Sequence, residues 1–506
     1  MSITRDKLIH LIGDDNVYQA VSLFCLVLVW GSTLIFYNSL AIFENPPDIS
    51  MYPDYYISFH KLTPYDCQLE YQIFSGEHYS WVNNFHIECD KIKIGLFGLV
   101  NSAGFLFGSL TFFLIKKIFN LKILVLSSII AYIFSLLSIP FYFTYQTVLI
   151  SLFLCGLFGF YCNIGLLLLV EDTLSKKKRI AFFGITFLGV KCIAYIYIPL
   201  VFTYNLEIYK LYYFISGQLL IAFFFILLFF FNSPMDYNKP NQKEKLIKIL
   251  KGIASINKRL DEFNNAINKE GAYIMNDTTD GGEYLLDSIT NKERINGWSL
   301  CKDSRLRYQF IIICFLSLAT RGMYRGISIY CKYINNSILL VLSYLYPSEL
   351  VILVVITLLM SCNLSRKITF FILYGILALS FILNYFMEPH ILLHLYIFNS
   401  IYRFCLIGLL IVLYAYSNDL YPETIRVIGL GINFAFAMIG EMSMSMIIEF
   451  IDEQLVNIGY IILSCLCFLL GVFLKKSEVN EKEEIKNEVE TMDAPALPLE
   501  DSINYE

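Results

Sequence analysis

Long apolar runs separated by polar segments dominate this chain. Twelve runs of about twenty residues consist almost entirely of apolar side chains. A helix of that length, rising about 1.5 Å per residue, crosses a hydrocarbon core about 30 Å thick. The runs are too long and too uniformly apolar for the alternating strands of a membrane β-barrel, so they predict transmembrane helices. The predicted spans are residues 20–42, 93–115, 122–143, 147–170, 180–203, 211–232, 308–330, 338–360, 367–387, 391–416, 427–450 and 455–474.

Long polar stretches divide these spans into two sets of six. The pattern predicts an all-α membrane protein of twelve transmembrane helices in two six-helix bundles, joined by a linker. The expected units are an N-terminal segment (1–19), a first bundle (20–232) with a long loop (43–92), a linker (233–307), a second bundle (308–474) and a tail (475–506). The chain after Lys476 has ten acidic residues and two lysines, which is typical of a disordered tail.

Composition excludes several functional classes. Hydrophobic residues make up 57% of the chain and charged residues 16%, whereas a soluble domain is about one quarter charged. A net charge of −5 argues against nucleic-acid binding. The sequence has no Walker A loop and no His-Glu-x-x-His motif, so we expect no ATP-driven pump, no metal and no cofactor. A membrane enzyme would need a clustered His, Asp or Ser constellation, and we find none, so we expect a protein that is not an enzyme.

Basic residues gather at alternate connections between the spans. Lys116, Lys117 and Lys122 lie between the second and third spans, and residues 176–179, between the fourth and fifth, are all basic. Connections on the opposite side carry few lysines or arginines. Because basic connections remain on the cytosolic side of a membrane, we expect both termini and the linker in the cytosol. The expected location is the plasma membrane.

An acidic residue followed, after six residues, by an arginine occurs once in each half. Asp172 and Arg179 follow the fourth span, and Asp419 and Arg426 follow the tenth. The same element at the same place in two sets of six spans indicates related bundles, as in alternating-access carriers. We expect these four residues to have gating or structural roles.

Six motifs resemble a known family in their order along the chain. They are Gly13 with Tyr18-Gln19, Ser80-Trp81-Val82 with Glu88-Cys89-Asp90, Leu169-Val170-Glu171-Asp172 with Lys178-Arg179, Asn232-Ser233-Pro234, Tyr324-Arg325-Gly326, and Leu413-Tyr414 with Asp419-Leu420-Tyr421-Pro422, Arg426 and Gly429-Leu430-Gly431. In this order they resemble the major facilitator superfamily, and within it the organic cation and anion transporters of solute carrier family 22. The resemblance implies two pseudo-symmetric six-helix bundles that move small organic ions by alternating access, either as a facilitator or as a secondary active carrier.

Several positions depart from that family pattern. Lys116 stands where the family has an aspartate, and Asn232 and Met235 replace the glutamate and the arginine of Glu-Ser-Pro-Arg. These are inner gate positions in the superfamily. An alternative therefore stays open, in which the chain is a transporter-like receptor or a membrane assembly subunit without transport.

The family's first loop is linked by cysteines, which makes Cys67 and Cys89 a candidate disulfide.

Five charged residues lie well inside predicted spans. A charge near the bilayer centre costs several kcal/mol, so it usually lines a cavity or is paired. Three roles are open for these charges. They can form structural pairs of an arginine with a glutamate, bind substrate in a central cavity, or extend to the lipid headgroups. The resemblance places their spans around the cavity. The five are Lys191, Arg321, Arg325, Glu349 and Glu441.

Tyr324 and Met438 complete the candidate binding set. The family carries Asp in cation carriers and Arg in anion carriers where this chain has Met438, so the resemblance leaves the charge of the substrate open. The basic residues favour an anion or zwitterion, whereas Glu441 favours a cation. The expected partners are a small organic ion and the lipid bilayer; the coupling ion is left open. Tyr37 is a candidate aromatic side chain lining the substrate cavity.

The linker contains a predicted amphipathic helix. Apolar residues recur at helical spacing between Leu246 and Ile267, with lysines between them. Such a helix rests on the inner leaflet or packs beneath the bundle, and the resemblance favours packing.

Overall fold

The computed structural model describes most of the predicted spans and part of the loops. The described residues are 12–13, 16–43, 49–51, 55–57, 71–73, 81–87, 90–141, 144–174, 176–203, 208–234, 243–266, 304–334, 349–358, 365–386, 392–421, 426–451 and 453–474. Cys67 and Cys89 lie outside them, so the predicted disulfide remains a prediction.

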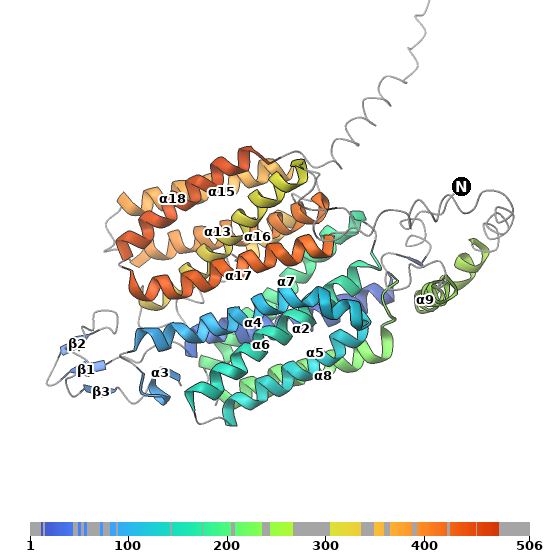
Figure 1. Cartoon of the computed structure of the whole chain (residues 1–506), viewed down its shortest axis with the longest axis horizontal. Helices are drawn as coiled ribbons and strands as arrows, with labels where there is room; N and C mark the ends of the chain where they lie inside the picture. The colour runs from blue at the N-terminus through green and yellow to red at the C-terminus, as the bar shows by residue number, and fades with distance from the viewer. Residues whose placement is uncertain are drawn as a thin grey trace, which may run out of the picture.

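Helices run side by side through the whole bundle (Figure 1). The first half contains α2 (Val17–Phe43), α4 (Lys91–Ile118), α5 (Leu121–Ser138), α6 (Tyr145–Glu171), α7 (Lys176–Thr203) and α8 (Ile208–Phe229). The second half contains α13 (Ser304–Ile334), α15 (Arg366–Phe386), α16 (Leu392–Leu420), α17 (Arg426–Phe450) and α18 (Glu453–Val472), together with a helix over residues 349–358.

The twelve-helix prediction is confirmed. Among the described residues, ten helices are long and apolar enough to cross a membrane. Two shorter apolar helices occupy Gly184–Tyr197, within α7, and Glu349–Leu358. Each predicted span therefore contains a helix.

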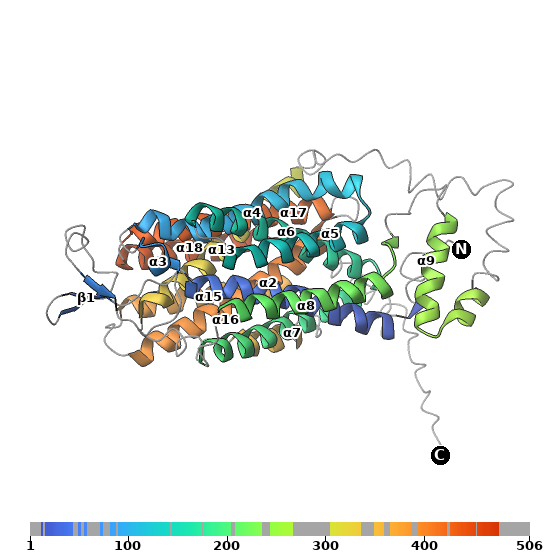
Figure 2. The same cartoon turned by 90° about the horizontal axis from the view of Figure 1, so that it is seen from below.

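A small sheet forms in the 43–92 loop, where the sequence predicted no strand. Strands β1 (Ile49–Met51), β2 (Tyr55–Ile57) and β3 (Tyr71–Ile73) pair antiparallel in the order β2-β1-β3. The sheet and the linker helix α9 (Lys243–Ile256) lie at opposite ends of the bundle (Figures 1 and 2). We call these the sheet end and the linker end.

Local chemistry sets the start and the direction of α4. The Asp90 side chain accepts a hydrogen bond from the Lys93 backbone N–H at 3.1 Å and pairs with the Lys93 Nζ at 2.9 Å. This cap satisfies a donor that the first turn leaves unpaired. Only Phe119 and Asn120 separate α4 from α5, so the two helices run antiparallel.

Glycines permit the closest helix contacts in each half. A Cβ on Gly104 of α4 would collide with the Phe153 carbonyl oxygen of α6. A Cβ on Gly440 of α17 would collide with the Leu318 carbonyl oxygen of α13. Small residues let helix backbones approach closely in a membrane, where van der Waals packing drives association. The two halves then meet where α4 packs against α17 and α2 against α13.

The linker helix packs on the protein through its apolar face. The buried cluster there contains Ile12, Tyr18, Leu250, Ile253, Ala254 and Phe263. The Asn257 side chain accepts a hydrogen bond from the Tyr18 backbone N–H at 3.0 Å and donates to the Ile12 carbonyl oxygen at 2.7 Å. This arrangement matches the packing alternative, because the apolar face of α9 is covered by the start of the chain.

Candidate functional site

A buried carboxylate joins the two halves near the middle of the bundle. Glu349 accepts hydrogen bonds from the Lys191 Nζ of α7 and from the Arg403 Nη1 of α16, each at 2.7 Å. Lys191 belongs to the first half, and the other two residues belong to the second. The side chain of Glu349 is 0% exposed, and those of Lys191 and Arg403 are nearly as buried. The two cations stabilise a carboxylate that would otherwise be costly at this depth.

A second buried carboxylate, Glu441 of α17, is held from both halves. The Arg321 Nε of α13 lies 2.8 Å from its Oε2. From the first half, the Tyr37 hydroxyl of α2 donates to its Oε1 at 2.8 Å and the Ser102 hydroxyl of α4 donates at 2.7 Å. One turn further along α17, the Ser445 hydroxyl accepts from the Arg325 Nε at 3.3 Å.

Two tyrosine rings connect these groups. The Tyr324 ring centroid lies 5.6 Å from Lys191 and from Arg403 and 5.7 Å from Arg321. The Tyr37 ring lies 5.4 Å from both Arg321 and Arg325. A cation near an aromatic face gains about 0.5–2 kcal/mol. The rings therefore help to hold neighbouring cations close together.

We call this assembly the central polar cluster. Its members are Tyr37, Ser102, Lys191, Arg321, Tyr324, Arg325, Glu349, Arg403, Glu441 and Ser445. Its described charged side chains are four cations and two carboxylates, an excess of two positive charges. Arg321 is the most accessible of the three residues that pair directly with the carboxylates, with 25% of its side chain exposed.

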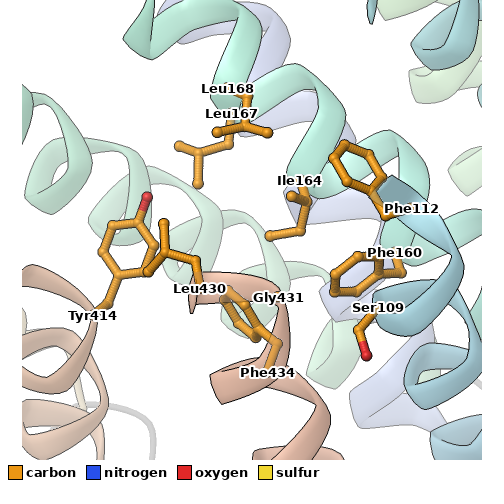
Figure 3. A pocket seen from close by; sticks show the side chains of 10 residues that line it. All are labelled: Ser109, Phe112, Phe160, Ile164, Leu167, Leu168, Tyr414, Leu430, Gly431 and Phe434. Carbon is orange, nitrogen blue, oxygen red and sulfur yellow. The ribbon is translucent and has the colours of Figure 1, made fainter. Parts of the chain in front are cut away.

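An apolar layer separates the central polar cluster from the linker end. It encloses a pocket of about 10 Å³, the space of about one water molecule (Figure 3). Its lining residues are Ser109, Phe112, Phe160, Ile164, Leu167, Leu168, Tyr414, Leu430, Gly431 and Phe434. The Phe160 ring of the first half meets the Phe434 ring of the second edge to face, with centroids 6.0 Å apart. The halves are thus in contact on this side of the cluster.

A hydrogen bond crosses the halves beside this apolar layer. The Tyr414 hydroxyl donates to the Glu171 Oε1 at 2.7 Å, and the Glu171 side chain is buried. The neighbouring Asp172 accepts a hydrogen bond from the hydroxyl of Ser233, the first residue of the linker. The side chains of Arg179, Asp419 and Arg426 lie outside the described residues, so their predicted gating roles stay predictions.

The structure brings the candidate residues together and adds one further charged residue, Arg403. Lys191, Arg321, Tyr324, Arg325 and Glu349 join Glu441 in one connected set. Met438 is buried one turn before Glu441 on α17. Arg403 was not among the residues predicted from the sequence. An arginine inside a predicted span is a visible signal, and the same criterion that selected the other charges applies to it.

Metal binding finds no support in the described part of the chain. No group of three or more His, Cys, Asp or Glu side chains is placed to hold a metal ion there. The central polar cluster instead offers cationic and hydroxyl donors, which suit an anionic or polar organic group.

Solved transporter structures share this fold. The inward open xylose transporter XylE from E. coli has a TM-score of 0.59 at 12% identity, over 90% of this chain and 96% of that chain. The same proton:xylose symporter bound to 6-bromo-6-deoxy-D-glucose has a TM-score of 0.59 at 12% identity, over 93% and 96%. The peptide transporter POT in complex with alafosfalin has a TM-score of 0.54 at 11% identity, over 93% and 97%. At these identities the likeness concerns the fold alone.

Sequence comparison identifies the family. A search of curated proteins finds no match to this chain. The family model described as Major Facilitator Superfamily matches residues 49–383, which is well over half of the chain and includes parts of both bundles. Ten helices of membrane-spanning length among the described residues identify a multi-pass membrane protein. Together with the shared fold, the family match shows that this chain belongs to the Major Facilitator Superfamily of membrane transporters.

Proposed function

We propose that this protein carries small organic anions across the membrane by alternating access. The observation that carries the proposal is the excess of cations over carboxylates among the described residues of a buried cluster between the two halves. An anion placed there gains charge-assisted hydrogen bonds in a low-dielectric site, where such bonds are strong. A cation would face four cationic side chains and two carboxylates that are already paired with cations. The resemblance to solute carrier family 22 supports organic ions as the substrate class.

Both halves contribute directly to the proposed binding site. Lys191, Tyr37 and Ser102 come from the first half, and the two carboxylates that they contact come from the second. A solute that binds between these groups interacts with both halves, so rotation of one half against the other changes its access. This is the requirement for a carrier whose site near the midplane is reached from each side in turn.

The proposed orientation follows the basic residues. Lys116 and Lys122 flank the connection between α4 and α5 at the linker end. Basic connections remain cytosolic, so we propose that the linker end and both termini face the cytosol and the sheet end faces outward.

We further propose the plasma membrane as the location. A cysteine introduced at Lys251, on the exposed face of α9, should react with a membrane-impermeant maleimide only after cells are permeabilised.

Exchange in proteoliposomes tests the anion proposal. The probes are isethionate, succinate and glycerol 3-phosphate as anions, tetraethylammonium as a cation, glycine betaine as a zwitterion and xylose as a neutral solute. We expect exchange of at least one labelled anion and none of tetraethylammonium. Arg403→Gln should abolish that exchange, whereas Lys251→Gln should leave it at the wild-type rate. Absence of exchange for every probe, with folded protein, would support the non-transporting alternative.

A further inference from the structure

Arg321 uses only one of its three guanidinium nitrogens for hydrogen bonding in the described part of the chain. Its Nε donates to the Glu441 Oε2 at 2.8 Å. The two terminal nitrogens, Nη1 and Nη2, make no hydrogen bond to any residue that the structure describes. The side chain is 25% exposed. A guanidinium holds its N–H donors in a flat fork, so the outer edge of this fork is available to a bound group.

The other cations of the central polar cluster are already engaged or buried. The Lys191 Nζ and the Arg403 Nη1 each lie 2.7 Å from an oxygen of Glu349, and both side chains are almost completely buried. Arg325 is 2% exposed, and its Nε donates to a serine hydroxyl at 3.3 Å. An anion that binds at the Arg321 fork therefore needs to break none of these contacts.

The orientation of the fork is fixed within the second half of the molecule. Arg321 lies on α13 and Glu441 lies on α17, and the residues next to them pack closely. A Cβ on Gly322 of α13 would come within 3.1 Å of the Gly440 carbonyl oxygen of α17. Two tyrosine rings, centred 5.4 and 5.7 Å from the guanidinium carbon, lie beside the fork. Because the ion pair joins two helices of one half, it keeps the fork oriented when the halves rotate.

We propose that Arg321 recognises the anion, with Nη1 and Nη2 donating side by side to two oxygens of its head group. This inference rests on the proposed function. It identifies the substrate class as organic oxyanions, acids whose carboxylate or sulfonate offers two oxygens to one guanidinium. Bidentate pairs of this kind are strong and geometrically specific. A halide has the same charge as such an acid but no pair of oxygens, so it lacks this recognition.

A lysine at position 321 separates recognition from structural support. Arg321→Lys keeps a positive charge beside Glu441, but it presents one ammonium group in place of the flat fork. An arginine that only neutralised Glu441 would tolerate this change with little effect on substrate affinity. An arginine that binds the head group through two nitrogens would not.

The kinetics of isethionate exchange distinguish these two roles. Wild type, Arg321→Lys and Arg259→Lys are reconstituted in proteoliposomes, and initial rates are measured over a range of isethionate concentrations. We expect Arg321→Lys to raise KM by about tenfold or more, because charge-assisted hydrogen bonds are lost. Its kcat should change much less, since the lost contact is a binding contact. Arg259→Lys makes the same substitution at a partly exposed position of the linker and should keep the wild-type KM.

Competition between small anions tests the substrate class. Methanesulfonate offers a head group with several oxygens and no further polar group, and chloride offers charge alone. We expect methanesulfonate to inhibit isethionate exchange by wild type, and chloride at the same concentration to have no effect. Inhibition by chloride as strong as that by methanesulfonate would overturn the assignment of oxyanions.

Chemical modification of the wild type supplies a measurement that needs no variant. Phenylglyoxal condenses with the two terminal nitrogens of an arginine, and peptide mass spectrometry identifies the modified residue. Arg321 should react, whereas Arg403, which is buried and paired through Nη1, should not. Methanesulfonate should slow the modification of Arg321, and chloride should not.

The outcomes separate this inference from the proposed function. Isethionate exchange by wild type with an unchanged KM in Arg321→Lys, or with no protection of Arg321 by methanesulfonate, would overturn this inference alone. If Arg321→Lys does not fold, protection of the wild type decides. Protection of Arg321 without exchange of any anion would overturn the proposed function and leave the binding site in place.

Discussion

The Lys191 Nζ and the Glu349 Oε2 lie 2.7 Å apart across the boundary between the two halves of the molecule. Neither residue is near the other in the chain, and both side chains are almost completely buried. An ion pair at this boundary must adapt whenever the halves rotate. The pair therefore connects the two halves at the site that we propose for substrate binding.

Removal of the buried carboxylate tests how much the pair contributes to stability. Glu349→Leu should lower the free energy of unfolding in detergent by about 3–5 kcal/mol, because Lys191 and Arg403 lose a carboxylate that both contact. Tryptophan fluorescence during thermal or denaturant unfolding gives the value. Glu262→Gln, an exposed carboxylate on the linker, should change stability by less than about 0.5 kcal/mol. Equal stability of Glu349→Leu and wild type would contradict the role assigned to the pair.

Close helix packing beside the central polar cluster leads to a second prediction. In Gly440→Ala the new Cβ meets the Leu318 carbonyl oxygen, so α13 and α17 must separate. Overpacking of this kind typically costs about 1–3 kcal/mol. The separation also moves Arg321 away from Glu441, so transport should fall with stability. Gly459→Ala on α18, where a Cβ meets nothing within 4 Å, should be at least as stable as wild type.

Closure at the linker end gives a third prediction. Tyr414→Phe removes the hydrogen bond to Glu171, which is worth about 1 kcal/mol and corresponds to a roughly fivefold change in the open population. A cysteine at Ser109, in the apolar layer, should then react faster with a maleimide by a similar factor. Tyr385→Phe on the exposed face of α15 is the control. An unchanged rate in Tyr414→Phe would show that this hydrogen bond does not hold the linker end closed.

The attachment of the linker leads to a fourth prediction. Asn257→Ala removes the hydrogen bonds to the Tyr18 N–H and the Ile12 carbonyl oxygen, which costs about 1–3 kcal/mol for buried groups. Hydrogen exchange of residues 243–266 should accelerate, while exchange in α4 stays the same. Ser255→Ala, at an exposed position next to the same turn, should exchange like wild type. Equal protection in both variants would mean that α9 is held by its apolar face alone.

The sequence predicted the helices well because lipid imposes a simple rule. A span must be long, apolar and internally hydrogen-bonded, and these properties are visible in one dimension. The rule has no equivalent in the 43–92 loop, where three-residue strands depend on pairing between distant segments. The small sheet formed by β1, β2 and β3 was missed for that reason.

The sequence singled out most residues of the central polar cluster and only part of their pairing, and their role in binding stays a prediction. Charges inside spans identified Glu349, Glu441 and the cations around them, with the exception of Arg403. The Arg321–Glu441 pair was one of the arrangements that the sequence allowed. The pairing of Glu349 with Lys191 and Arg403 was not predicted, because it depends on how α7, α16 and residues 349–358 come together in space.

Selectivity for charge tests most directly whether this protein carries organic anions. Labelled isethionate and tetraethylammonium are offered to the same proteoliposomes, and exchange of each is followed with wild type, Arg403→Gln and Lys251→Gln. We expect exchange of the anion alone, lost in Arg403→Gln and retained in Lys251→Gln. Exchange of tetraethylammonium, or anion exchange that persists in Arg403→Gln, would contradict it.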